Sequence, residues 1–188
     1  MATIALVAAM HFVVSYASVL AGMLLWTLLG PLAVFVTGIA DQGIPCLLLA
    51  MLLVLIPRVG VAAWSLATVF VLNTLFGGFA GVPSLAYIGV SIVVHETLLA
   101  ASGITTTSLL RVPRPRPKVA TVLRVALVLG LCKAVNVFAQ FTLAKLLFRF
   151  MFADWYLISA SLVTGLGYGS VGAAIGLVLG YRLRRVAV

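Results

Sequence analysis

Ionisable and amide side chains occur inside long apolar stretches of this sequence, where they are costly. Lys133, Asn136 and Gln140 recur at spacings of three and four residues within the apolar run 119–148. That spacing places the three side chains on one face of a helix. Because an ammonium and two amides cannot be left in lipid, we expect this face to point into the interior of a helix bundle.

A second apolar run contains Glu96, preceded by His95. A rise of about 1.5 Å per residue places both Glu96 and Lys133 near the middle of a bilayer. This similar depth predicts an ion pair between neighbouring helices. The pair has two interpretations, a structural lock on helix register or the floor of a solute pocket. Asp41 interrupts another run, and His11 and His95 are interpreted as satisfied interior histidines rather than ligands.

Aromatic side chains gather at the far ends of these runs, away from most of the basic residues. For Trp26 and Trp155 the simplest interpretation is an interfacial aromatic belt. Aromatics combined with amides and a cation also form pockets for a small planar, polar ligand, and glycines around Phe79 would let its loop act as a lid. The candidate substrate-binding residues are Phe79, Tyr87, Glu96, Lys133, Asn136, Gln140, Trp155 and Tyr156.

Motifs for catalysis, ATP binding or metal binding are absent from the sequence. There is no Walker A loop, nucleophile elbow or H-E-x-x-H, and the chain has only three carboxylates. Cys46 and Cys132 lie in apolar runs without metal-ligand or disulfide spacing. We therefore predict a protein that is not an enzyme, with no catalytic residues, no metal and no cofactor of its own.

The composition indicates an integral membrane protein. Of 188 residues, 64% are hydrophobic and 8% are charged, whereas a soluble domain is about 45–50% apolar and about 25% charged. The net charge of +9 would be compatible with nucleic-acid binding in a soluble chain. Here the basic residues lie between apolar runs and no reader motif accompanies them, so they indicate orientation in a membrane instead.

Six apolar stretches approach the length of about 20 residues that a membrane-spanning helix needs. Their residues run continuously rather than alternating, which favours helices over a barrel. We predict an all-α fold, with one domain over 1–188 that is an integral membrane bundle of six transmembrane helices. The stretches are 4–25, 31–56, 61–76, 83–103, 119–148 and 156–181.

Basic residues predict the topology. A stretch at about 108–118 alternates proline with arginine, which indicates an extended linker. The positive-inside rule places this linker, Arg58 and the basic C-terminal tail in the cytoplasm, together with both termini. The prediction is a multi-pass protein of the cell (plasma) membrane, with the linker in contact with anionic lipid or a cytoplasmic partner.

Small residues recur every fourth position in the first and last stretches, a spacing that lets helix backbones approach closely. The last stretch has glycines at positions 165, 169, 172, 176 and 180, for which internal packing is the simplest interpretation. Ala5 and Ala9 in the first stretch have the same interpretation. For these alanines, contact with a helix of another protein is a serious alternative, because small-residue faces serve both purposes.

Taken together, the chain resembles the substrate-binding S components of energy-coupling factor (ECF) transporters. The shared features are both ends inside, a small-residue first helix, a glycine-bearing loop after the third helix and a glycine-rich last helix. The middle is most similar to the thiamine-precursor (hydroxymethylpyrimidine) type, in the segment 56–63 and in the spacing of Gly77, Gly81, Tyr87 and Glu96. An acidic residue expected in the third helix is absent.

This resemblance implies capture of a small vitamin or vitamin precursor from the outer side. Ala5 and Ala9 would then contact the membrane coupling subunit, and two cytoplasmic ATPases would use the ATP. Nucleic acid is not an expected partner. The alternatives are a self-sufficient secondary transporter or channel with a His95, Glu96 and Lys133 relay, and a structural subunit without a ligand; a membrane enzyme ranks last.

Overall fold

The computed structural model describes residues 2–76, 82–104, 118–149 and 153–186, and all regular structure within these ranges is helical. Helices occupy each of the six stretches expected from the sequence. The elements are α1 (Ala2–Leu29), a 3₁₀ turn η1 (Gly30–Leu32), α2 (Ala33–Gly38), a π-helical segment η2 (Ile39–Gly43), α3 (Ile44–Leu55), α4 (Val61–Leu75), α5 (Val82–Ala101), α7 (Val119–Phe148), α8 (Asp154–Ala160), a π-helical segment η3 (Ser161–Tyr168) and α9 (Gly169–Val186).

The helices fit a membrane protein. Three helical stretches are long and apolar enough to cross a bilayer, namely Ala2–Leu55, Val119–Leu146 and Asp154–Arg184. The first of these includes α1, α2 and α3. The chain turns within it at Gly30, whose φ is +55°, so α1 and α3 are separate helices. Two further helices, Val61–Leu75 and Leu85–Ala101, are apolar but shorter.

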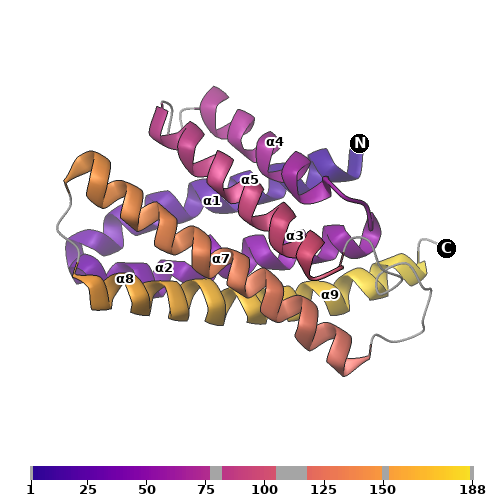
Figure 1. Ribbon diagram of the computed structural model, residues 1–188. Helices are drawn as coiled ribbons and strands as arrows, with labels where there is room; N and C mark the ends of the chain where they lie inside the picture. Colours follow the sequence, from indigo (N-terminus) through magenta and orange to yellow (C-terminus); the bar gives the residue numbers. More distant parts are fainter. Residues whose placement is uncertain (1, 77–81, 105–117, 150–152, 187–188) are drawn as a thin grey trace.

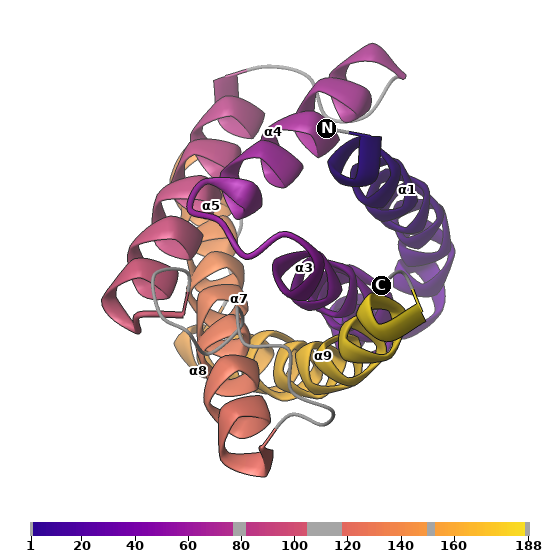
Figure 2. The same ribbon diagram turned by 90° about the vertical axis from the view of Figure 1, so that its right-hand side faces the viewer.

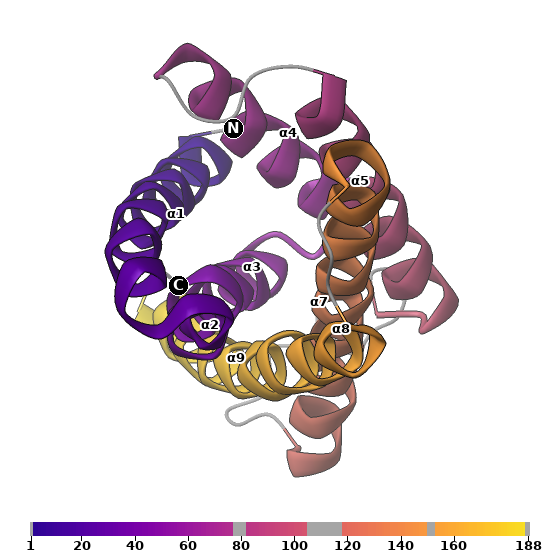
Figure 3. The ribbon, with the colours of Figure 1, turned by 90° about the vertical axis from the view of Figure 1, so that its left-hand side faces the viewer.

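The elements surround α3. Helices α1, α4, α5, α7 and α9 follow one another around the bundle, and α3 lies inside them against α9 (Figures 2 and 3). The start of α1 and the end of α9 lie at the same end of the bundle (Figure 1). We call this the terminal end, and the other the far end.

The apolar core fills the half of the bundle nearest the terminal end. It is built by α3 together with the last turns of α5, the first half of α7 and the part of α9 from Ala173 to Tyr181. Burying these side chains against one another keeps this half tightly packed. The buried members are Cys46, Leu49, Ala50, Leu53, Val54, Ala62, Leu99, Ile104, Val125, Ala126, Leu129, Ala173, Leu177 and Tyr181.

Glycines hold α9 directly against the backbone of its neighbours. A Cβ atom placed on Gly172 or Gly176 would overlap the carbonyl oxygen of Gly43 or Leu47, respectively. A Cβ on Gly165 would overlap the backbone of Ala134 in α7. The internal-packing interpretation of the glycine stripe is therefore confirmed for these positions.

The π-helical segment η2 has a local cause. Pro45 lacks an N–H, and its ring crowds the carbonyl of the residue four positions earlier, which is Asp41. The helix accommodates this by widening, so that the Ile44 N–H bonds to the carbonyl of Ile39. Such widened turns occur often at functional sites, and this one carries Asp41 and Gln42.

Candidate functional site

Polar residues from four elements meet in the interior, on the far-end side of the apolar core. Lys133 of α7 is at the centre of this layer and is only 5% exposed. Its ammonium interacts electrostatically with His11 of α1, Asp41 of η2 and His95 of α5. We call these four residues, together with Gln42, Ser91 and Asn136, the Lys133 layer.

Hydrogen bonds join α5 to α7 within this layer. His95 Nδ1 lies 2.8 Å from the carbonyl oxygen of Ser91. Because a carbonyl only accepts, Nδ1 must carry the proton, which leaves Nε2 as an acceptor. The side-chain nitrogen of Asn136 donates to Ser91 Oγ at 2.9 Å. The ring and the amide are thereby fixed in orientation, and both are fully buried.

Several buried atoms of the layer have unused hydrogen-bonding capacity. Within the described residues, His95 Nε2, Asn136 Oδ1 and Gln42 Oε1 have no hydrogen-bond partner. Each such atom costs about 1–3 kcal/mol when buried without one. A buried ammonium on α7 together with the unpartnered acceptors His95 Nε2 and Asn136 Oδ1 therefore offers both donors and acceptors to a small molecule.

Other members of the layer keep part of their surface accessible, although the bundle surrounds them. His11 and Asp41 are each partly exposed, as is Tyr87, which lies two turns from His95 on α5. All three are nevertheless densely surrounded by protein. These three side chains therefore border the Lys133 layer without being completely buried.

The apolar core adjoins the Lys133 layer on its terminal-end side. Leu99 follows His95 by one turn of α5, and Leu129 precedes Lys133 by one turn of α7; both leucines are fully buried. Leu53 of α3 belongs to the same cluster. The Lys133 layer therefore has closely packed apolar side chains on its terminal-end side.

The structure assigns Glu96 a different position from the one expected. Its Oε1 and Oε2 atoms accept hydrogen bonds from the backbone N–H groups of Ala63 (2.9 Å) and Gly60 (3.1 Å). These are free N–H groups at the start of α4, where a carboxylate is favoured. The predicted Glu96–Lys133 ion pair does not form, because the Glu96 carboxylate is used to cap α4.

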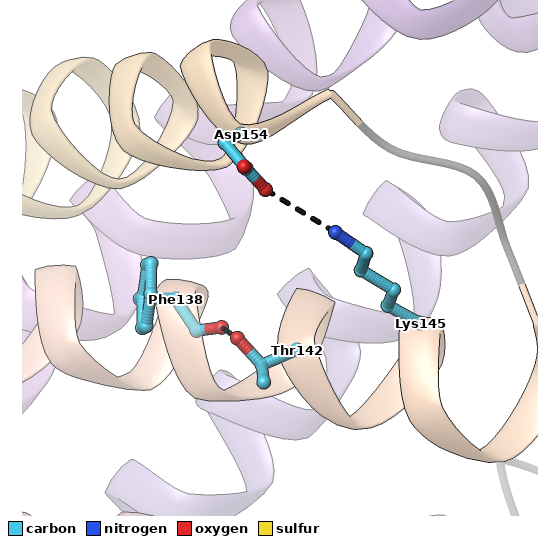
Figure 4. Close-up of polar contacts among 4 residues, drawn as sticks. All are labelled: Phe138, Thr142, Lys145 and Asp154. Atoms are coloured by element: carbon cyan, nitrogen blue, oxygen red, sulfur yellow. Dashed lines mark hydrogen bonds and ion pairs between the residues drawn. The ribbon is translucent and has the colours of Figure 1, made fainter.

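The ion pair that the described residues do form lies at the far end. Lys145 Nζ, near the end of α7, is 3.2 Å from Asp154 Oδ1 at the start of α8 (Figure 4). One turn before Lys145, the Thr142 hydroxyl bonds to the Phe138 carbonyl within α7 (Figure 4). Both charged side chains are exposed, so the pair contributes little to stability.

The remaining predicted residues of α7 and α8 separate into buried and exposed groups. Gln140 is exposed and does not join Lys133 and Asn136 in the buried layer. Trp155 is 69% exposed, as expected for a residue of the aromatic belt. Tyr156 is buried, and its hydroxyl donates to the Pro31 carbonyl oxygen at 2.8 Å.

Aromatic packing around Tyr156 closes one side of the far end. Its ring meets Phe35 of α2 and Phe141 of α7 edge to face, with ring centroids 6.1 Å and 5.7 Å away. Contacts of this kind fix the position of α8 relative to α2 and α7. Phe79, the expected lid residue, lies outside the described residues.

The two alanines predicted to bind a partner lie on α1. Ala5 is exposed and Ala9 is partly exposed. Exposed large apolar side chains continue the same outer surface of α1, for example Leu6 (63%) and Val13 (62%). This surface faces outward from the bundle, either to lipid or to another protein.

Sequence reasoning did not include Asp41, Gln42 or His95 among the substrate-binding residues, although it placed His95 with Lys133 in the alternative relay. The signal for Asp41 and Gln42 was present, because Pro45 follows Asp41 by four residues and predicts a distorted helix there. The expectation that His95 is a satisfied interior histidine is wrong, because its Nε2 atom has no partner among the described residues, and no sequence pattern indicates this. Among the described residues, no group of His, Cys, Asp or Glu has the arrangement of a metal site.

Comparisons with protein-family models, with curated proteins and with solved structures find no match for this chain.

Proposed function

We propose that the chain is a membrane-embedded solute-binding protein, and specifically the substrate-capture subunit of an ECF-type uptake transporter. In this proposal six helices span the cell membrane, with both termini and the basic linker in the cytoplasm. The solute is a small vitamin or vitamin precursor, and a thiamine pyrimidine is the first candidate. It enters from the far end and rests in the Lys133 layer.

One observation carries the proposal: the interior of an apolar bundle holds polar side chains whose hydrogen-bonding capacity is not used within the protein. Lys133 is nearly inaccessible, and the described residues offer no partner to His95 Nε2 or Asn136 Oδ1. Intramembrane polar groups of this kind are expensive and typically mark a binding site or pathway. A purely structural role would favour mutual pairing instead.

The packed apolar core next to the Lys133 layer supports capture of a solute rather than its free passage through the bundle. Closely packed apolar side chains separate the Lys133 layer from the terminal end, so a bound solute cannot leave towards the cytoplasm without rearrangement of the bundle. In the proposed mechanism the energy for that rearrangement comes from ATP hydrolysis by two partner ATPases. A membrane coupling subunit would transmit it through the outer surface of α1, at Ala5 and Ala9.

Native mass spectrometry of the protein purified in mild detergent tests the binding site. We expect wild-type protein to retain a small molecule and Lys133→Gln to lose it. Removing a charge-assisted hydrogen bond of about 1.5–3 kcal/mol lowers affinity roughly tenfold to a hundredfold. Lys145→Gln is the matched control, because it removes the same charge from an exposed position. Equal retention by Lys133→Gln and the control would refute the site.

A self-sufficient secondary transporter is the second candidate, and the effect of the Lys133 charge on His11, Asp41 and His95 favours it. Ionisable groups in series inside a membrane can carry a proton or ion. Glu96 is not part of this series, since it caps α4. Solute uptake by liposomes containing only this protein, abolished by a protonophore, would support this candidate over the capture subunit.

A further inference from the structure

Basic side chains gather at the terminal end of the bundle, where the turn between α3 and α4, the start of α7 and the end of α9 all lie (Figures 1 and 2). Arg58, Lys118, Arg124 and Arg182 are exposed there, and Arg184 is partly exposed. We call these five residues the basic rim. They come from segments far apart in the sequence, so the fold brings their charges to one end of the molecule.

The carboxylate side chains of the protein do not balance this charge. The chain has three of them, and Asp154 is paired with Lys145 at the far end. Asp41 lies in η2, before α3 begins, whereas the basic rim starts only after α3 has ended. Glu96 reaches the start of α4, but both of its oxygens accept hydrogen bonds from backbone N–H groups. The terminal end therefore carries an excess of positive charge.

Hydrogen bonds hold two guanidinium groups of the rim against neighbouring helix ends. Arg124 Nη2 donates to the carbonyl oxygen of Ser102, just after α5, at 2.7 Å. Arg184 Nη1 lies 3.5 Å from the carbonyl oxygen of Val54, in the last turn of α3. A carbonyl oxygen is uncharged and takes one of the five N–H donors of a guanidinium. These bonds therefore orient the two side chains without cancelling their charge.

An exposed apolar side chain adjoins each fully exposed arginine of the rim in the sequence. These neighbours are Val59, Leu123 and Leu183, which are 62%, 56% and 49% exposed. Apolar surface beside a cation is unfavourable in water, but it is stabilised where lipid headgroups meet acyl chains. The pairing of cations with apolar surface therefore favours a phospholipid over a soluble anion as the molecule that binds here.

We propose that the basic rim binds the phosphodiester headgroups of anionic phospholipids, while its apolar neighbours contact the acyl chains. A guanidinium can bind two phosphate oxygens at once in a fixed geometry. Each basic residue near an anionic membrane surface raises the affinity about fivefold. The proposal extends the expectation for the linker at about 108–118, most of which lies outside the described residues, to side chains of α7, α9 and the α3–α4 turn.

The lipid site is separate from the proposed solute site. The Lys133 layer and the basic rim lie on opposite sides of the apolar core. An anionic lipid at the rim thus needs neither a bound solute nor a coupling subunit.

Native mass spectrometry of the full-length protein, purified in a non-ionic detergent, tests the proposal by titration with phosphatidylglycerol or with phosphatidylcholine of the same acyl chains. We expect phosphatidylglycerol to bind more tightly, because it carries a net negative charge. Arg58→Gln/Arg182→Gln should weaken its binding about twentyfold and leave phosphatidylcholine binding unchanged. Lys145→Gln/Arg149→Gln is the matched control, since it removes the same charge from exposed positions at the far end.

Three results would overturn the proposal. One is equal affinity of the wild-type protein for the two lipids. Another is a loss of phosphatidylglycerol binding in Arg58→Gln/Arg182→Gln that is no greater than in the far-end control. The third is displacement of bound phosphatidylglycerol by an equal concentration of inorganic phosphate, which would identify a site for a free anion. Solute retention is read from the same spectra, so failure of the lipid site is distinguishable from failure of the proposed function. Far-UV circular dichroism confirms that each variant is folded.

Discussion

Replacing Gly176 by alanine tests whether direct backbone contact holds α9 against α3. A Cβ atom at this position would overlap the Leu47 carbonyl oxygen and lie 2.8 Å from the Leu47 Cα atom. The obstacle is backbone, so no side-chain rotation relieves it, and the two helices must move apart. Gly89 of α5 is the matched control, because a Cβ there meets nothing within 4 Å.

The expected magnitude combines two opposing terms. Overpacking of a close contact lowers the free energy of unfolding by about 1–3 kcal/mol. Moving the helices apart by about 0.5–1 Å also removes roughly a quarter to a half of the dispersion energy of each atom pair along the rest of the interface. Alanine in place of glycine returns about 0.5–1 kcal/mol through helix propensity. We therefore expect Gly176→Ala to lose about 1–2 kcal/mol, whereas Gly89→Ala is neutral or gains up to about 1 kcal/mol.

The measurement is unfolding of the detergent-purified protein, followed by far-UV circular dichroism in an SDS titration or a thermal ramp. Gly176→Ala should unfold at lower SDS concentration or temperature than wild type, and Gly89→Ala at the same or a higher value. A Gly176→Ala protein as stable as the Gly89→Ala protein would show that α9 does not approach α3 as closely as described. The packing of the bundle around α3 would then have to be revised.

Three further substitutions test single contacts. Glu96→Gln should lower the free energy of unfolding by about 1–2 kcal/mol, because the cap on α4 is weaker, and solute retention should not change. Loss of retention at an unchanged unfolding midpoint would instead place Glu96 in the site. Tyr156→Phe should cost about 0.5–1.5 kcal/mol, because the hydroxyl bond to the Pro31 carbonyl is lost, and an unchanged midpoint would show that this bond contributes nothing. Ala5→Trp and Ala9→Trp should leave unfolding and solute retention unchanged while preventing co-purification with a membrane coupling subunit, so undiminished co-purification would exclude this surface as the contact.

The division of the bundle into two halves has a functional consequence. Apolar side chains pack closely in the half nearest the chain ends, whereas the other half contains the polar Lys133 layer and the aromatic contacts of Tyr156. A tightly packed half resists deformation, while a layer with unmatched polar groups gains stability when a ligand matches them. Ligand binding should therefore stabilise the far half most.

The two π-helical segments lie next to this layer and to each other. Gly38, the last residue of α2 before η2, is so close to Thr164 of η3 that a Cβ atom would overlap its side chain. In η3 and just after it, Gly165 and Gly169 pack on Ala134 and Lys133 of α7. Widened helical turns are frequent at functional sites, and here both adjoin the residues that hold the charges.

The sequence alone determined the class of the protein and the outline of its helices. A long apolar stretch indicates a membrane helix without knowledge of its neighbours, because the bilayer is the solvent for each stretch and the helix satisfies its own backbone groups. The predicted run 119–148 coincides with α7, and the glycine stripe was correctly assigned to packing. Lys133 and Asn136 were correctly placed in the interior, since their cost in lipid depends only on residue type.

The tertiary structure decided which polar groups face one another. Counting residues along two helices gave Glu96 and Lys133 a similar depth, but depth leaves the rotation of each helix about its axis undetermined. That rotation is set by packing with all neighbours, and it directs Glu96 to the start of α4 and His95 to Asn136. Likewise, the π-helical turn at Asp41 could be predicted from Pro45, but no pattern within one stretch specifies which side chains face it across the bundle.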